Sequence, residues 1–163
     1  MTVTVRPATV DDLAALVEMA HALIAQHGKS TEYLTAEALR RDAFGPEADV
    51  RIVIAELDGA AAGFALYHDA YESDYAARGV YVCDIFIAEA ARRHGVGRAL
   101  MAAVARDAKS RGRTFLWWAS QPWNTEAVAF YDSIGASTEP VNAHALTFEY
   151  FETLAREADQ SDA

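Results

Sequence analysis

Hydrophobic and polar residues alternate with a period of two in several short stretches, which is the pattern of strands with one buried face. "VTVRPA" alternates in this way, and two apolar runs joined by Asp58-Gly59 predict a hairpin, because this dipeptide favours a two-residue turn. "GVYVCDIFIA" has few polar residues, so we expect a central strand covered on both faces. Strands are therefore expected at residues 3–8, 51–57, 60–71, 79–88, 113–120 and 145–155, the last closing the fold with the option of running into a helix.

Other stretches repeat their apolar positions every three or four residues, as one face of a helix does. The first such stripe consists of Leu13, Leu16, Val17, Ala20 and Ile24. Thr9 and Asp12 precede this stripe with the spacing of a capping box. Helices are expected at residues 9–28, 35–44, 96–112 and 124–135. The order β-α-α-β-β-β-α-β-α-β predicts one α/β domain over residues 1–155, followed by a frayed tail at 156–163.

The composition is that of a soluble globular protein, with 52% hydrophobic and 23% charged residues. One cysteine, Cys83, excludes an internal disulfide and a CxxC metal site, so a cytoplasmic location is expected. No secretory h-region and no long apolar run is present, so we expect no membrane partner. The formal charge of −10 disfavours nucleic acid and favours cationic partners, although an acidic surplus can also serve only solubility.

The junction "ARRHGVGRAL" lies between the expected central strand and the next helix. The first amides of a helix lack internal partners and carry a positive partial charge, and glycine lets a bulky anion approach the backbone. Arg92, Arg93 and Arg98 add charges that suit phosphate oxygens. The stretch therefore indicates a pyrophosphate cradle of neither the Walker nor the dinucleotide type. A glycine-rich turn with solvated arginines is the alternative.

A second candidate stretch, "QPWNTEAVAFYDSIGA", places Asn124 at the start of a helix and Tyr131 two helical turns later on the same face. The asparagine could bind an amide-bearing ligand while the tyrosine hydroxyl reaches a reacting group. Phe130 and Tyr131 could equally be core aromatics.

Together these two stretches resemble the GNAT superfamily of N-acetyltransferases. Arg92 to Gly97 match the family signature R/Q-x-x-G-x-G/A, and the later pattern matches its cofactor-binding and catalytic helix. That later pattern consists of Trp123, Asn124, Ala127, Phe130, Tyr131, Gly135 and Ala136. Within the superfamily the chain looks like the diamine (spermidine/spermine) N-acetyltransferase branch. The resemblance covers residues 2 to 150 and implies a mixed, mostly antiparallel sheet flanked by helices.

The resemblance also implies a site for acetyl-CoA as cosubstrate. The backbone of Ile85, Phe86 and Ile87 would pair with the pantetheine arm. The pyrophosphate would be bound by Arg92, Arg93, His94, Gly95, Val96, Gly97 and Arg98. The lower arm would contact Asn124, Thr125, Glu126 and Ala127. Tyr131 matches the tyrosine that acts as general acid toward the departing thiolate.

The attacking amine must first lose a proton, because an alkylamine has a pKa of about 10. Asp84 is the only acid within the central strand, and an acid among apolar residues is costly unless it is paired or functional. We therefore predict Asp84 as the proton acceptor, acting directly or through water. A purely structural hydrogen-bond acceptor is the alternative.

The chain departs from the diamine branch at two points. The branch has Glu-Asp in this strand, whereas this chain reads Val82-Cys83-Asp84. The acidic residue that the branch uses after the catalytic helix is also not evident, where this chain reads "EPVNAHAL". Cys83 is expected to be a small buried residue rather than a nucleophile. The histidines show no metal-ligand spacing, so we expect no metal.

These features predict an enzyme that transfers acetyl from acetyl-CoA to a primary amine of a small molecule. Two alternatives stay open: a non-catalytic acyl-CoA-binding regulatory module, and an acetyltransferase acting on a protein or peptide amine. Because members of the resembled branch commonly form dimers, we also expect a homodimer. The sequence does not identify the acceptor.

Overall fold

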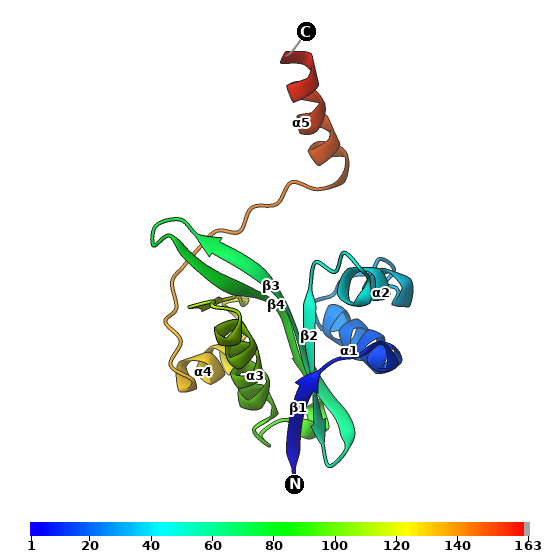
Figure 1. Cartoon of the computed structure of the whole chain (residues 1–163), viewed down its shortest axis with the longest axis vertical. Coiled ribbons are helices and arrows are strands. Elements are labelled where there is room, and N and C mark those ends of the chain that lie inside the picture. Colours follow the sequence, from blue (N-terminus) through cyan, green and yellow to red (C-terminus); the bar gives the residue numbers. More distant parts are fainter. Residues whose placement is uncertain (162–163) are drawn as a thin grey trace. The chain divides into compact units, whose positions relative to one another are not determined.

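In the part of the chain that the structure describes, five strands form one sheet in which spatial order follows chain order, and Figure 1 labels the first four. They are β1 (Val3–Pro7), β2 (Arg51–Leu57), β3 (Ala60–Glu72), β4 (Ala77–Ile87) and β5 (Leu116–Trp117). Neighbours from β1 to β4 run antiparallel, and β4 and β5 run parallel. The structure, a computed structural model, describes residues 1–161. The expected mixed, mostly antiparallel sheet is confirmed.

Helices cover both faces of this sheet, as Figure 1 shows. On one face α1 (Leu13–Gln26) and α2 (Ala36–Phe44) pack on side chains of alternate strand positions. This core consists of Leu13, Leu16, Met19, Ala20, Leu39, Ile52, Ile54, Phe64 and Phe86. On the other face lies α3 (Val96–Ser110), which buries Val96, Leu100, Met101, Ala103, Val104 and Ala108. The period of two along β2 thus sends neighbouring residues into different cores.

Local chemistry sets where these elements begin and turn. The expected capping pair is present at the short 3-10 helix η1 (Val10–Asp12), where the Asp12 carboxylate accepts from the Thr9 amide at 2.8 Å. The Thr35 hydroxyl accepts from the Ala38 amide at 3.1 Å and caps α2. The hairpin turn has φ of +51° at Asp58 and +84° at Gly59, which is the geometry that this dipeptide favours.

Residues 1–124 form one compact unit, and the chain from Thr125 onward forms a second. The second unit contains α4 (Thr125–Ser133) and α5 (Phe148–Ser161). The strand expected at 145–155 is wrong, because most of that segment belongs to α5. Apolar residues recur there at Phe148, Phe151 and Leu154, a helical spacing, and a helix satisfies its own backbone while a strand needs a neighbour. Residues 125–161 contain no strand that could supply one.

The tail expected to fray begins at residue 156, and α5 continues through Ser161. Its last residues, 162 and 163, lie outside the described residues. The strand expected at 113–120 also differs, since only Leu116 and Trp117 are in the sheet. This shortening bears directly on the candidate site.

Candidate active site

A β-bulge interrupts β4 beside the candidate catalytic carboxylate. Asp84 lies opposite Leu66, and the next pair is Val82 opposite Tyr67, so Cys83 is an extra residue in β4. After an extra residue, each following side chain of the strand points to the opposite face of the sheet from the one it would otherwise occupy. Tyr81, opposite His68, and Asp84, opposite Leu66, therefore share one face of the sheet. Leu66 packs against the core under α1 and α2, which identifies that face.

On the side of β4 that faces β5, the strand has no neighbouring strand after Tyr81 among the residues that the structure describes. The two strands pair only at Val80 with Leu116 and at Tyr81 with Trp117. Within residues 1–161, no strand adjoins the remainder of β4 on that side, where Ile85, Phe86 and Ile87 lie. Alternate backbone groups of an extended strand point to this open edge, so a linear amide-bearing ligand can hydrogen-bond there as another strand would. The predicted cofactor-binding backbone thus lies at an accessible sheet edge.

Beyond β4 the chain makes a tight turn and enters α3. A 3-10 turn, η2 (Glu89–Ala91), leads to Arg93 with φ of +65° and Gly95 with φ of +82°. The first bond of α3 joins the Ala99 amide to the Gly95 carbonyl at 3.0 Å. The amides of Val96 and Gly97 therefore have no acceptor within the helix.

Charge reinforces the anion preference of this helix end. The side chains of Arg92, Arg93, His94 and Arg98 are exposed around it. Three guanidinium groups beside a helix N-terminus favour a polyanion, because the helix dipole and the cations act in the same direction. Such a helix end suits the pyrophosphate of a nucleotide cofactor, and the assignment of that group to this junction stays a prediction.

Asp84 is half-buried on β4, and burial raises the pKa of its carboxyl above the usual range. The charge of His27, which caps the C-terminus of α1, partly opposes this rise. A carboxylate with a raised pKa is a stronger base than a solvated one. His27 was missed from the sequence, where nothing in its spacing to Asp84 signals that the end of α1 lies near β4.

Cys83 is exposed, so the expectation of a buried cysteine is wrong. The bulge explains the difference, because the extra residue has no partner across the ladder and its side chain is not drawn into either core. Partial desolvation and the charge of Asp84 raise the pKa of its thiol to about 11. The thiol therefore stays protonated near neutral pH and is a poor nucleophile.

Tyr131 lies on α4 in the second unit and is buried, with 8% of its surface exposed. Its burial raises the pKa of the phenol, which keeps the hydroxyl protonated at neutral pH. The Tyr131 carbonyl accepts from the amides of Ile134 and Ala136, both at 3.1 Å, and Gly135 has φ of +89°. These two hydrogen bonds and the left-handed Gly135 end α4 just after Tyr131, as the position of Gly135 in the sequence predicted.

The remaining predicted residues lie where the first unit ends and α4 begins. Asn124 is the last residue of the first unit, and its amide donates to the Gln121 carbonyl at 2.9 Å. Thr125, Glu126 and Ala127 form the first turn of α4. The strand-to-helix boundary expected at Asn124 is therefore present.

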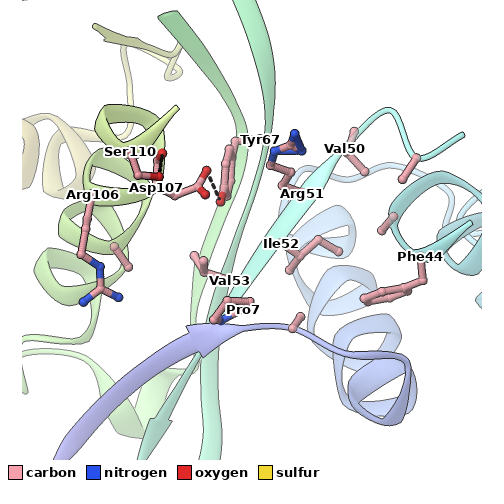
Figure 2. Close-up of a pocket in the computed structure, with 14 residues that line it drawn as sticks. Pro7, Phe44, Val50, Arg51, Ile52, Val53, Tyr67, Arg106, Asp107 and Ser110 are labelled. Carbon is pink, nitrogen blue, oxygen red and sulfur yellow. Dashed lines mark hydrogen bonds between the residues drawn. The ribbon is translucent and has the colours of Figure 1, made fainter. Parts of the chain in front are cut away.

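A cavity of about 540 Å³ lies elsewhere in the first unit, at the edge of β2 (Figure 2). Tyr67 points into it, and its hydroxyl donates to Asp107 of α3 at 3.1 Å. None of the predicted site residues lines this cavity. β1 pairs with β2 only as far back as Val53, so the start of β2, which lines this cavity, has no pairing with β1. The predicted base and the predicted anion site lie instead along β4 and at the start of α3.

Within residues 1–161, no three or more His, Cys, Asp or Glu side chains are grouped so that they could hold a metal ion. In the same part of the chain, every helix is too short or too polar to cross a bilayer.

The profile described as "Acetyltransferase (GNAT) family" matches residues 16–136, a span that includes β4, the turn into α3 and the tyrosine of α4. The chain belongs to the GNAT family of acetyltransferases. Membership agrees with the signature at Arg92 to Gly97. It makes the protein an N-acetyltransferase, and GNAT enzymes use acetyl-CoA as cosubstrate.

Several curated proteins are similar to this GNAT chain. The thialysine N-epsilon-acetyltransferase of Sus scrofa is 29% identical over 159 residues, which are 90% of this chain and 92% of the relative. The protein of the same name from Caenorhabditis elegans is 34% identical over 81% of this chain and 79% of its own length. L-ornithine N5-acetyltransferase NATA1 of Arabidopsis thaliana is 40% identical over 48% of this chain, a match that spans only 35% of that protein. These relatives support the predicted diamine acetyltransferase-like branch.

Solved structures share the fold of this GNAT domain. An integron cassette protein from the mobile metagenome of V. cholerae has a TM-score of 0.77 at 24% identity, with 96% of this chain and 99% of that chain covered. An aminoglycoside acetyltransferase, meta-AAC0020, from an uncultured soil sample has a TM-score of 0.75 at 15% identity, with 90% and 97% covered. The α/β architecture predicted from the sequence is thereby confirmed.

Proposed function

We propose that this enzyme acetylates a primary amine of a small molecule by direct attack of the amine on acetyl-CoA. One observation supports this most strongly: the open edge of β4 leads from a carboxyl of raised pKa, Asp84, toward the cationic N-terminus of α3. A base, an extended binding edge and an anion site therefore follow one another along one stretch of chain.

The cofactor-binding residues are those of the β4 edge and the turn into α3. The backbone of Ile85 to Ile87 would hold the pantetheine arm, and the amides between Arg93 and Arg98 would hold the pyrophosphate. When bound, acetyl-CoA supplies a thioester whose acetyl group an amine can take without a covalent enzyme intermediate. Asn124, Thr125, Glu126 and Ala127 are proposed to contact the lower arm on the strength of the family motif.

Asp84 has the properties required of the proton acceptor. Its raised pKa makes the carboxylate a better base, and its negative charge attracts the ammonium form of the substrate. Transfer of one proton from the ammonium group to Asp84, directly or through one water, leaves the neutral amine that can attack. The nearby charge of His27 opposes part of the rise that burial causes in the pKa of Asp84.

Tyr131 is proposed as the acid that donates a proton to the leaving thiolate. Support comes from its place in the family pattern and from its burial, which keeps the phenol protonated. The two protonation roles are complementary, since Asp84 takes the first proton of the ammonium group and Tyr131 gives one to the thiolate. The nitrogen loses its second proton to solvent as the amide forms. Solvent then reprotonates Tyr131 and takes the proton from Asp84, so each turnover releases one net proton.

The acceptor is proposed to be a small amine that carries further charge, like the amino acids in the names of the thialysine and ornithine acetyltransferases. The formal charge of −10 suits a cationic substrate. A protein or peptide amine and a non-catalytic binding role are the competing outcomes that the assay below separates.

The test is thiol release from acetyl-CoA with a panel of diamines, diamino acids, aminoglycosides and lysine peptides. We expect Tyr131→Phe to lower kcat by about 10²- to 10⁴-fold with little change in acetyl-CoA affinity, as for loss of a positioned acid. Tyr75→Phe, at a hairpin residue that is 83% exposed, is the matched control and should match wild type. A wild-type rate for Tyr131→Phe, or no turnover of any amine by wild type, would overturn the assignment.

Asp84 is tested by the pH dependence of kcat/KM. Because burial raises its pKa, the acid limb of the profile should lie above the range of a solvated aspartate, with the rate falling as pH drops through it. Asp84→Asn should lower the rate and remove this limb. Asp74→Asn, at an exposed carboxyl in the β3–β4 turn, is the control and should keep it. An unchanged limb in Asp84→Asn assigns the base to another group.

We also propose a homodimer located in the cytoplasm, a location that the single cysteine suits. Four apolar side chains of α5 are more than half exposed: Phe148, Tyr150, Phe151 and Leu154. Burial against a second copy would remove this apolar surface from water. Light scattering at micromolar concentration should give twice the mass of the chain, and a monomeric mass would contradict the proposal.

A further inference from the structure

Three aromatic rings line up across neighbouring strands beside the bulge. The His68 and Tyr81 ring centroids lie 5.4 Å apart, and those of Tyr81 and Trp117 lie 5.2 Å apart. His68 Nδ1 lies 2.8 Å from the Asp69 carbonyl, to which it donates, and this bond orients the first ring. We call these three residues the aromatic ladder.

Trp117 is the accessible end of the aromatic ladder. It is 50% exposed, whereas His68 and Tyr81 are half-buried. It lies on β5, the edge strand, so within residues 1–161 no further strand covers its outer side. The ladder therefore presents an indole to solvent and holds it with two rings behind.

The aromatic ladder lies on the same face of the sheet as Asp84. Tyr81 and Asp84 share that face only because the bulge at Cys83 inserts one residue between them. Burial raises the pKa of Tyr81 most, and the charge of Asp84 adds to the rise, which agrees with their proximity. Strand rise and strand spacing place the Cα atoms of Asp84 and Trp117 about 8 Å apart. This separation suits two amino groups joined by a short alkyl chain.

We propose that the aromatic ladder binds a second positive charge on the acceptor while Asp84 receives the proton of the reacting amine. Aromatic faces attract ammonium groups, and indole does so most strongly. The acceptor class is then an amine with a second cationic group several bonds from the first, such as 1,5-diaminopentane. This inference rests on the proposed function and adds the residues that select its substrate.

If the aromatic ladder only stabilised the sheet, its substitution would have a different effect. Cross-strand aromatic pairs stabilise sheets whatever the ligand, so a ladder of that kind would affect stability and would not distinguish one amine from another. The distinction is therefore a change in selectivity between two amines that differ only in the second charge.

The experiment compares 1,5-diaminopentane with pentylamine, which has the same chain and lacks the second amine. For each acceptor, KM and kcat are measured by thiol release in wild type, Trp117→Leu, Trp117→Phe and Tyr75→Leu. Binding of each amine to the full-length protein without acetyl-CoA is measured by calorimetry in parallel. Thermal unfolding of each variant checks that the fold is kept.

We expect Trp117→Leu to raise KM and Kd for 1,5-diaminopentane by about 3- to 30-fold, the range of a cation–π contact. The constants for pentylamine and kcat for both amines should stay unchanged. Trp117→Phe should retain most of the preference because it keeps an aromatic face, and Tyr75→Leu should behave as wild type.

Equal changes for the two amines in Trp117→Leu, or no change, would overturn the role of the aromatic ladder while leaving the acetyltransferase function intact. If wild type acetylates neither amine, calorimetry still decides the inference. Wild type that binds the diamine more tightly than pentylamine, with this preference lost in Trp117→Leu, supports the role of the ladder. Equal binding of both amines by wild type contradicts it. If Trp117→Leu unfolds, Trp117→Thr replaces it in the same binding assay, because threonine is also a good strand residue and has no aromatic face. Loss of the diamine preference then supports the ladder, and an unchanged preference contradicts it.

Discussion

Gly95 is the position at which the proposed pyrophosphate site can be tested most directly. It precedes α3 with φ of +82°, a left-handed conformation that L-residues adopt at a cost. A Cβ atom built there has no heavy atom within 4 Å. Gly95→Ala therefore introduces backbone strain and one methyl group, and it clashes with nothing in the protein itself.

Gly112 offers a matched control at the other end of the same helix. It has φ of +70°, and a Cβ there also has no neighbour within 4 Å. Strain of this kind costs about 1 to 2 kcal/mol. For a chain of this size each kcal/mol lowers Tm by about 2 to 4 °C, so both variants should show a similar small decrease.

The two variants should differ in their affinity for acetyl-CoA. At Gly95 the methyl group and the strained turn oppose the approach of phosphate to the amides that begin α3. Loss of one charge-assisted hydrogen bond, about 1.5 to 3 kcal/mol, corresponds to an increase in Kd of about 10- to 100-fold. Gly112→Ala changes no part of that turn, so its Kd should equal that of wild type.

Calorimetric titration of each variant with acetyl-CoA, alongside thermal unfolding, gives both quantities. Comparable Tm values with a weakened Kd only in Gly95→Ala support a pyrophosphate site at this turn. If Gly95→Ala binds acetyl-CoA as wild type does, or if both variants weaken binding equally, the reasoning about the turn is refuted.

Three further predictions concern charge and stability. Gly97→Glu should abolish acetyl-CoA binding in calorimetry, because it adds bulk and negative charge at the helix end, and an unchanged affinity would exclude that position from the anion site. Tyr67→Phe should lower the free energy of unfolding by about 1 to 2 kcal/mol in urea titrations, because it removes the bond to Asp107, and an unchanged midpoint would mean that this bond contributes nothing. Hydrogen bonds from Arg6 lower the pKa of Asp12 to about 2, so the stability from this pair should be present above pH 4 and lost as pH falls from about 4 to 2. It should amount to about 1 kcal/mol after solvent screening, and Asp12→Asn should remove that pH dependence in thermal unfolding.

Much of the candidate site could be predicted because its chemistry is local in the chain. The two glycines beside arginines predict a helix start, and α3 does begin at Val96 directly after Gly95. Asp84 could be selected because a lone acid in an apolar strand is costly wherever the strand lies. Capping residues and the Asp58-Gly59 turn were reliable for the same reason, since their effect reaches only a few residues.

Other features were decided by tertiary structure, because they depend on register and on partners far along the chain. The bulge that exposes Cys83 exists only in the pairing of β4 with β3, and no local pattern in "VYVCDIFIA" reveals an extra residue. The segment at 145–155 is compatible with a strand or a helix by its sequence. It forms mostly helix, and residues 125–161 contain no strand that could complete the hydrogen bonds of a strand there.

The aromatic ladder and the placement of His27 near Asp84 have the same origin. His68, Tyr81 and Trp117 come from three strands, and their rings meet only once β3, β4 and β5 are in register. The sequence by itself therefore determined which groups could do chemistry, since residue type and local backbone geometry follow from short-range interactions. The sheet determined which of them share one face, because strand register is the outcome of long-range packing that local patterns do not encode.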